Sequence, residues 1–188
     1  MTRAPVEARI GVVIGRKGSG KSFRVKRWLA KVKRWVAFDL RGEYAEVEGA
    51  RLWTDVRDFA AHLANGGTIE REVFACPKWQ FDAWCRFVFE TGDLVAVVEE
   101  IGRFVSPGWA PEPLQDLFDR NRHARVDLVC VGPRLAEIPK GLLHQADDVM
   151  HANVELPADV AFLAKWKGDA IAQRIANLPP HEFLRIRR

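Results

Sequence analysis

A glycine-rich run near the start of the chain carries the residue types that hold phosphate. It reads Gly15-Arg16-Lys17-Gly18-Ser19-Gly20-Lys21-Ser22 and is followed by Phe23. Glycines let a backbone curl until successive N–H groups point at phosphate oxygens, in conformations that side chains would obstruct. The lysine of this Walker A pattern can reach the β and γ phosphates, and the serine hydroxyl can ligate Mg²⁺. We therefore expect all nine residues to bind nucleotide, with Lys21 also catalytic, Ser22 also a metal ligand, and ATP and Mg²⁺ as the ligands.

Two adjacent acids end a strongly apolar run, Leu94-Val95-Ala96-Val97-Val98-Glu99-Glu100. Enzymes with such a phosphate-binding loop (P-loop) need a strand-end carboxylate that helps to hold Mg²⁺, often followed by one that activates water. This Walker B pattern assigns Glu99 to the magnesium shell and Glu100 to the general base. Asp39 ends an earlier apolar run and is a third candidate, either as an accessory carboxylate near the water or as a turn cap.

Short apolar runs alternate with helical stretches along the chain, and this order predicts an α/β fold. A mostly parallel central sheet with helices on both faces follows from strands that alternate with helices. The P-loop then follows a strand and opens a helix, which is the context that the motif requires. Strands are expected at 8–14, 35–39, 72–76, 94–99, 126–131, 148–155 and 182–186, and helices at 19–33, 56–64, 78–90, 113–124 and 157–176.

The composition suits one soluble domain covering residues 1–188. The longest purely apolar runs are too short to span a bilayer, and residues 1–5 lack the apolar centre of a signal peptide, so a cytoplasmic location is expected. The net charge is only +4, but no acidic residue occurs between Ala8 and Phe38, a stretch rich in Lys and Arg. That part of the surface should be strongly positive.

The chain resembles the FtsK/HerA superfamily of DNA-pumping ATPases, and within it the genome-packaging ATPases of tailless, membrane-containing double-stranded DNA viruses. The resemblance implies a RecA-like P-loop fold, ATP hydrolysis, double-stranded DNA as a partner and a homo-oligomeric ring, with a hexamer expected. Beside the P-loop, three segments carry it: Phe38-Asp39-Leu40-Arg41-Gly42-Glu43-Tyr44 is similar to D-x-x-G-E-Y, Val97-Val98-Glu99-Glu100-Ile101-Gly102-Arg103-Phe104 to an apolar-E-E-x-x-R-F segment, and Leu178-Pro179-Pro180-His181-Glu182-Phe183 to L-P-x-G-E-F, with His181 in place of glycine.

Two further positions follow from the resemblance. The stretch from Arg120 to Val129 resembles the helix-to-strand junction that holds a trans-acting arginine, and Arg122 is our choice for that catalytic role, with Arg120 and Arg125 as alternatives. A solvated basic helix end favoured by the helix dipole is the other interpretation. Arg134 falls at the family's sensor position, although Pro133 stands where a glutamine is usual.

Sequence-independent grip on DNA comes from Lys and Arg contacts to phosphates. Arg103 and Trp109, in the loop 102–111, are the DNA-contact candidates, and a packed lid or a subunit interface is the alternative for this loop. A basic stripe on the helix after the P-loop is a second candidate, although long basic side chains commonly occupy solvent faces.

The leading hypothesis is an ATP-driven double-stranded DNA translocase, a viral genome-packaging motor that works in the host cytoplasm or is retained in the virion. A capsid or membrane portal protein is a candidate further partner. The alternatives are a cellular or plasmid DNA pump, a filamentous-phage assembly ATPase, a small-molecule P-loop kinase and a nucleotide-gated binding protein. The adjacent Glu99 and Glu100 favour hydrolysis over phosphate transfer to a metabolite.

Overall fold

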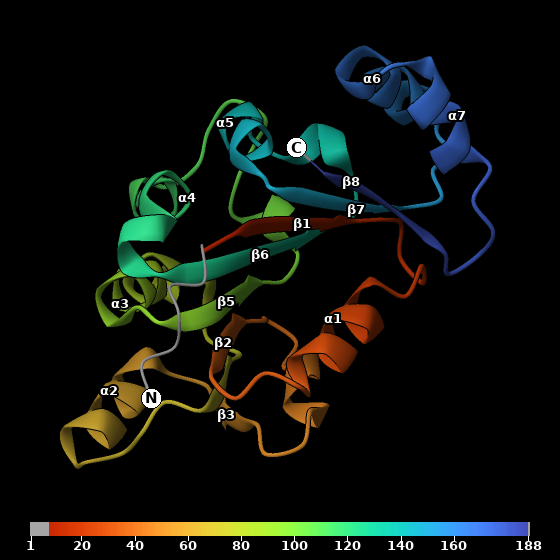
Figure 1. Ribbon diagram of the computed structural model, residues 1–188. Coiled ribbons are helices and arrows are strands. Elements are labelled where there is room, and N and C mark those ends of the chain that lie inside the picture. Colours follow the sequence, from red (N-terminus) through yellow and green to blue (C-terminus); the bar gives the residue numbers. More distant parts are fainter. Residues whose placement is uncertain (1–7, 188) are drawn as a thin grey trace.

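The computed structural model describes residues 8–187, and an eight-stranded sheet runs through them (Figure 1). Residues 1–5, on which the expected location depends, lie outside the described part. The strand order is β3-β4-β2-β5-β6-β1-β7-β8, with every neighbouring pair parallel except β7 and β8. The predicted mostly parallel α/β sheet is therefore confirmed. The strands are β1 (Ile10–Ile14), β2 (Trp35–Phe38), β3 (Arg51–Trp53), β4 (Arg71–Phe74), β5 (Leu94–Val98), β6 (Val126–Gly132), β7 (Asp148–Ala152) and β8 (Phe183–Arg187).

Helices cover both faces of this sheet. Successive residues of a strand point to opposite faces, so each face has its own hydrophobic core. In β1, Val12 and Ile14 join one core and Val13 joins the other. The first core also takes side chains from α2 (Val56–Ala64), α3 (Phe81–Thr91), α4 (Glu112–Ala124), α5 (Lys140–Gln145), α6 (Pro157–Lys167) and α7 (Asp169–Ala176). The second is covered by α1 (Lys21–Leu29) and by the 3₁₀ turn η1 (Glu43–Glu46). Shorter 3₁₀ turns are η2 (Lys78–Gln80), η3 (Ile101–Arg103) and η4 (Leu135–Glu137).

Several predicted boundaries were wrong, each for a local reason. The helix expected at 157–176 is two helices, because Gly168 has φ 91° and ψ 158° and cannot continue a helix. The first helix begins at Lys21, not Ser19, since Gly20 is left-handed with φ 89°. The strand expected at 148–155 ends at Ala152. The sequence analysis missed the strand β3, which has three residues at the sheet edge, and the six-residue helix α5.

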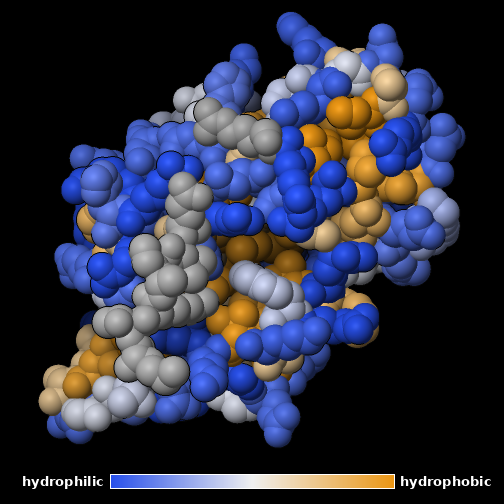
Figure 2. Space-filling view, in the orientation of Figure 1, coloured by the Kyte–Doolittle hydropathy of each residue, from blue (hydrophilic) through white to orange (hydrophobic). Residues whose placement is uncertain are grey.

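The helices α6 and α7 form a pair beyond the β7–β8 edge of the sheet, at the upper right of Figure 1. Hydrophobic residues gather over this pair in the otherwise mostly hydrophilic face of Figure 2, and Phe162, Trp166 and Ile171 are only partly buried. Among residues 8–187, no helix combines the length and apolarity that crossing a membrane would need.

The parallel strands bring four loops to one edge of the sheet. The strands β1, β2, β5 and β6 all run the same way, so the segments that follow Ile14, Phe38, Val98 and Gly132 leave the sheet at its carboxyl edge. Such an edge is the usual place for a ligand in an α/β sheet. The P-loop and the predicted acidic residues therefore meet there.

Candidate functional site

The P-loop backbone is shaped to hold an anion. Gly18 and Gly20 have φ values of 79° and 89°, which side chains disfavour. A Cβ atom on Gly15 would lie 2.6 Å from both the Cβ of Ala152 and the Oγ of Ser19. The helix α1 begins at Lys21 without a side-chain cap, so its first N–H groups are available to a ligand. A left-handed turn that leads into a helix N-terminus presents several backbone N–H groups to one point, and this arrangement suits a phosphate.

A cleft of about 450 Å³ joins the P-loop to the ends of β2, β5 and β6. Its volume lies in the range of small-molecule sites. Every predicted catalytic or metal-binding residue except Arg122 lines this cleft, and so do other predicted site residues; together they are Lys17, Gly18, Lys21, Ser22, Asp39, Glu99, Glu100 and Arg103. The two motifs, about 80 positions apart in the sequence, therefore form one site.

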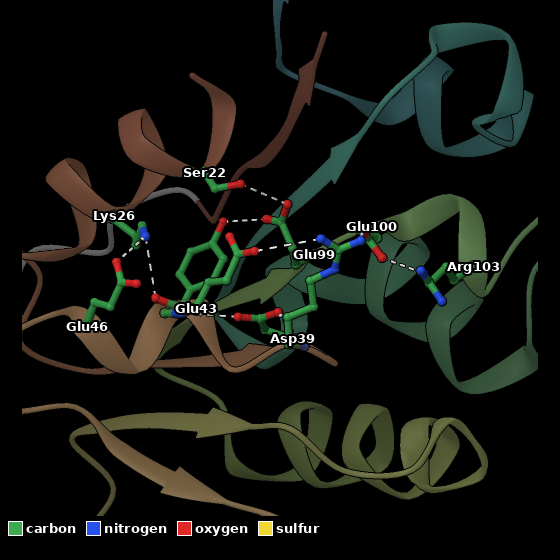
Figure 3. Close-up of polar contacts among 10 residues, drawn as sticks. Ser22, Lys26, Asp39, Glu43, Glu46, Glu99, Glu100 and Arg103 are labelled. Carbon is green, nitrogen blue, oxygen red and sulfur yellow. Dashed lines mark hydrogen bonds and ion pairs between the residues drawn. The ribbon is translucent and has the colours of Figure 1, made fainter. Parts of the chain in front are cut away.

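Glu99 is the centre of a hydrogen-bond network at the base of the cleft (Figure 3). Ser22 Oγ donates to Glu99 Oε1 at 3.0 Å, and Tyr44 Oη donates to Glu99 Oε2 at 2.5 Å. Burial raises the pKa of Glu99, and the hydrogen bonds from Tyr44 and Ser22 oppose that rise. The carboxylate is thus fixed beside the hydroxyl that the sequence predicted to share its metal.

These residues fit a magnesium ion that is bound together with a nucleotide. Mg²⁺ is usually held by one or two carboxylates plus substrate phosphates, with water completing its shell. Ser22 and Glu99 supply one hydroxyl and one carboxylate at 3.0 Å from each other. Within residues 8–187, no group of three His, Cys, Asp or Glu side chains could hold a metal by itself. A shared phosphate would complete the coordination.

Lys21 and Ser19 fit the phosphate itself. Lys21 Nζ donates to the carbonyl of Arg16 at 3.0 Å, so the ammonium lies across the loop. Burial lowers the pKa of Lys21, and the nearby Glu99 and Glu100 counteract this. The Oγ of Ser19 is buried and has no hydrogen-bond partner among residues 8–187. A buried hydroxyl without a partner is costly, and a phosphate oxygen would satisfy it.

Asp39 is almost completely buried and orients the turn that carries Tyr44. Its Oδ1 accepts from the N–H of Arg41 and its Oδ2 from the N–H of Tyr44, both at 3.0 Å. Both carboxylate oxygens are thus engaged as the turn-cap interpretation expects. Tyr44, which the sequence analysis did not place in the site, touches Glu99 directly. The D-x-x-G-E-Y segment contained the signal for this role, since Tyr44 is its last residue and follows Asp39 by five positions.

Glu100 is held by arginines on two sides. Its backbone is left-handed, with φ 50° and ψ 47°, and its carboxylate is ion-paired with Arg41 Nη2 at 3.2 Å and with Arg103 Nε (Figure 3). A left-handed conformation at a residue other than glycine is uncommon and often marks a functional position. The candidate base therefore faces the cleft while its charge is neutralised.

The other predicted residues lie outside this network. Arg134 forms an ion pair with Asp159 of α6, with contacts of 2.8 and 3.0 Å, while Pro133 lines the cleft. Arg122 lies near the end of α4, which precedes β6, at the edge of the sheet opposite to the P-loop. Its Nη2 is 3.8 Å from Asp147 Oδ1. Arg122 therefore does not contribute to the cleft of its own chain.

The alternatives to Arg122 are engaged in contacts of their own. Arg120 Nη1 lies 3.3 Å from Asp116 Oδ1, and Arg125 forms an ion pair with Asp93. The contact of Arg122 with Asp147 is longer than either of these. Arg122 is thus the least constrained of the three.

Arg103 and Trp109 border a second groove of about 600 Å³, which adjoins the cleft at Gly102 and Arg103. Three basic residues line it, Lys78, Arg86 and Arg103, against two acidic ones, Asp82 and Glu112, and Trp109 is 58% exposed. The loop is closed by paired backbone hydrogen bonds between Ser106 and Trp109, at 2.9 and 3.1 Å. We call the groove beside this loop the basic groove.

Comparison with solved structures finds this fold in other proteins. The genome packaging NTPase B204 from Sulfolobus turreted icosahedral virus 2, in complex with ATP-gammaS, matches 96% of this chain and 92% of its own, with a TM-score of 0.78 and 19% identity. VirB4 of Thermoanaerobacter pseudethanolicus matches 100% of this chain and 91% of its own, with a TM-score of 0.63 and 12% identity. The N-terminal domain of zonular occludens toxin from Neisseria meningitidis matches with a TM-score of 0.54 over 80% of this chain and 79% of its own, at 16% identity. No protein-family model and no curated protein matches the sequence. The expected resemblance is thus confirmed at the level of the fold.

Proposed function

We propose that this chain is an ATPase that moves double-stranded DNA, and specifically a genome-packaging motor. The observation that carries the proposal is the contact between Ser22 of the P-loop and Glu99, which directly follows β5, with Glu100 beside it in the same cleft. A fold shared with the packaging NTPase B204 supports the same reading. These residues supply the phosphate cradle, the metal ligands and the base that ATP hydrolysis requires.

The chemistry assigns a separate task to each residue. The P-loop amides and Lys21 would bind the β and γ phosphates, and Ser22 and Glu99 would hold Mg²⁺, whose charge would offset that of the phosphate oxygens. Glu100 accepts a proton from the water that attacks the γ phosphorus, and the bond from that phosphorus to the ADP oxygen breaks. Inorganic phosphate and ADP leave. Glu100 must first separate from Arg41 or Arg103, because these two ion pairs occupy both of its carboxylate oxygens and leave neither free to contact the attacking water.

The basic groove is our candidate for DNA. Lys78, Arg86 and Arg103 can contact phosphates, and the exposed Trp109 offers a surface for the duplex. Arg103 lines both the basic groove and the cleft at the P-loop, which we call the ATP cleft. A DNA phosphate that binds Arg103 in the groove would therefore disturb the ion pair between Arg103 and Glu100. This geometry favours a motor over a small-molecule kinase.

The place of Arg122 supports a ring. Since Arg122 lies at the sheet edge opposite to the P-loop, it can act on a nucleotide only in a neighbouring subunit. We infer a homo-oligomeric ring, with a hexamer as the expected number, whose further partner is a capsid or membrane portal protein. In this role the protein works in the cytoplasm of the host cell.

The decisive experiment measures phosphate release by the full chain with and without double-stranded DNA, with Glu100→Gln as the inactive control. We expect DNA to raise the rate for the wild-type chain and Glu100→Gln to abolish it. Phosphate release that ignores DNA, or transfer of the γ phosphate to a metabolite, would argue for a different enzyme.

A further inference from the structure

A third groove, of about 670 Å³, adjoins the P-loop on the side away from Glu99. Gly20 lines it from the P-loop, and Phe23 and Trp28 line it from α1. His181 lines it from the turn before β8, and Phe183 from the first position of that strand. We propose that this aromatic groove binds the purine base of the nucleotide whose phosphates lie on the P-loop. The inference rests on the proposed function and adds how the nucleoside end of ATP is recognised.

The strand order sets the direction of the bound nucleotide. Glu99 and Glu100 follow β5, which lies two strands from β1 on one side, while β7 and β8 lie on the other side. A nucleotide whose terminal phosphate points at Glu100 must therefore extend its base toward β7 and β8. The aromatic groove is on that side, because Phe183 is the first residue of β8.

Neighbouring residues of the P-loop and α1 line either the ATP cleft or the aromatic groove, which agrees with this direction of the nucleotide. Lys21 and Ser22 line the cleft that holds the acidic residues, whereas Gly20 and Phe23 line the aromatic groove. A single phosphate chain on the loop would thus connect the two spaces. The groove therefore borders the phosphate site.

The side chains of the groove suit a flat aromatic ligand. Phe23 is 64% exposed and Trp28 41% exposed. The guanidinium of Arg24 lies 4.7 Å from the centroid of the Phe183 ring, and that of Arg27 lies 5.7 Å from the centroid of the Phe23 ring. Nucleobases stack on aromatic rings and on arginine planes. The arginines also favour a ligand that carries negative phosphates.

His181 is held against the P-loop in an unfavourable backbone conformation. Its φ is 65°, in a turn closed by a hydrogen bond of 3.2 Å from the N–H of Glu182 to the carbonyl of Pro179. Its Nδ1 is 3.4 Å from the position that a Cβ on Gly20 would take. A left-handed residue other than glycine costs stability, and such strain is often retained where a side chain serves a ligand. The imidazole is thus a second stacking or hydrogen-bonding group for the base.

The test compares two ligands that differ only in the nucleoside. Binding of ATP and of inorganic triphosphate, each with Mg²⁺, is measured by calorimetry on the full chain without DNA. Phe23→Ala should weaken ATP binding about 10-fold, because removing an aromatic side chain that stacks on a base typically has an effect of that size. The same substitution should leave triphosphate binding unchanged. The matched control is Trp79→Ala, which removes another exposed aromatic side chain, one that does not line the groove. It should change neither affinity.

His181→Gly gives a readout that a purely structural role would not produce. Glycine accepts the left-handed conformation, so the variant should unfold at a higher temperature, yet bind ATP more weakly and triphosphate as before. The proposal is overturned if Phe23→Ala weakens the binding of ATP and of triphosphate equally, or if it leaves ATP binding intact. Because neither DNA nor turnover enters the measurement, it separates this inference from the proposed motor activity.

Discussion

The carboxylate of Glu100 is ion-paired with the guanidinium of Arg103, three residues further along the chain. Glu100 faces the ATP cleft, and Arg103 also lines the basic groove beside Trp109. One side chain thus connects the proposed catalytic base to the surface where we expect DNA. A polyanion that binds Arg103 competes directly with Glu100, so DNA binding should free the base.

The first prediction concerns this connection. Arg103→Ala should raise ATP hydrolysis in the absence of DNA, because Glu100 loses one of its two cations, and should reduce the stimulation by DNA. Loss of one phosphate contact should also lower the slope of DNA affinity against salt by about one. Steady-state rates and a salt titration of DNA binding measure both effects.

Arg86→Ala is the matched control for Arg103→Ala. Arg86 lines the basic groove but not the ATP cleft. Its loss should weaken DNA binding while the rate without DNA stays at the wild-type value. An Arg103→Ala variant whose DNA-independent rate equals that of the wild type would disprove the coupling.

The second prediction concerns the buried Tyr44. Tyr44→Phe removes only the hydroxyl that donates to Glu99, and groups that orient a metal ligand are commonly worth 10- to 100-fold in metal affinity. We expect the Mg²⁺ concentration for half-maximal ATP hydrolysis to rise by about that factor. Thermal unfolding of the variant should show a folded protein, and an unchanged Mg²⁺ requirement would remove Tyr44 from the site.

The same variant should become more sensitive to acid. Burial raises the pKa of Glu99, and the Tyr44 hydrogen bond opposes that rise. Without this bond the pKa of Glu99 rises further, so a larger fraction is protonated at a given pH and cannot bind a cation. The loss of Mg²⁺ affinity in Tyr44→Phe should therefore grow as the pH falls, which rate measurements across a pH series can follow.

Local sequence patterns predicted the parts of the site that depend on neighbouring residues. The P-loop and the pair Glu99 and Glu100 are fixed by short segments at strand ends, so their shared cleft followed from parallel strands. The contacts that join separate segments did not follow. Tyr44 reaches Glu99 across 55 positions, and Arg134 finds Asp159 across 25. Such pairs depend on how the elements pack, which hydrophobic periodicity does not specify.

The third prediction separates a structural from a sensing role for Arg134. Its partner Asp159 has a side chain only 8% exposed, so Arg134→Ala leaves a nearly buried carboxylate without its cation. We expect the free energy of unfolding to fall, but only modestly, because Arg134 itself is 40% exposed and its charge is screened by solvent. Denaturant unfolding measures it. Glu137→Ala, which removes only a 3.9 Å contact to Arg134, is the control and should change stability little. Full stability with lost turnover in Arg134→Ala would indicate the sensor role.

The last prediction tests whether Arg122 acts on a neighbouring subunit. Arg122→Ala should bind ATP nearly as the wild type does, because Arg122 lies at the far edge of the sheet from the P-loop, yet turnover should fall about 10³-fold or more. Arg120→Ala is the control from the same helix and should retain turnover. Mixing Arg122→Ala with the inactive Glu100→Gln should restore part of the activity, since Arg122 of a Glu100→Gln subunit can complete the intact cleft of an Arg122→Ala subunit. If Arg122→Ala hydrolyses ATP at the wild-type rate, or if its lost activity does not return on mixing, the trans-acting role is wrong.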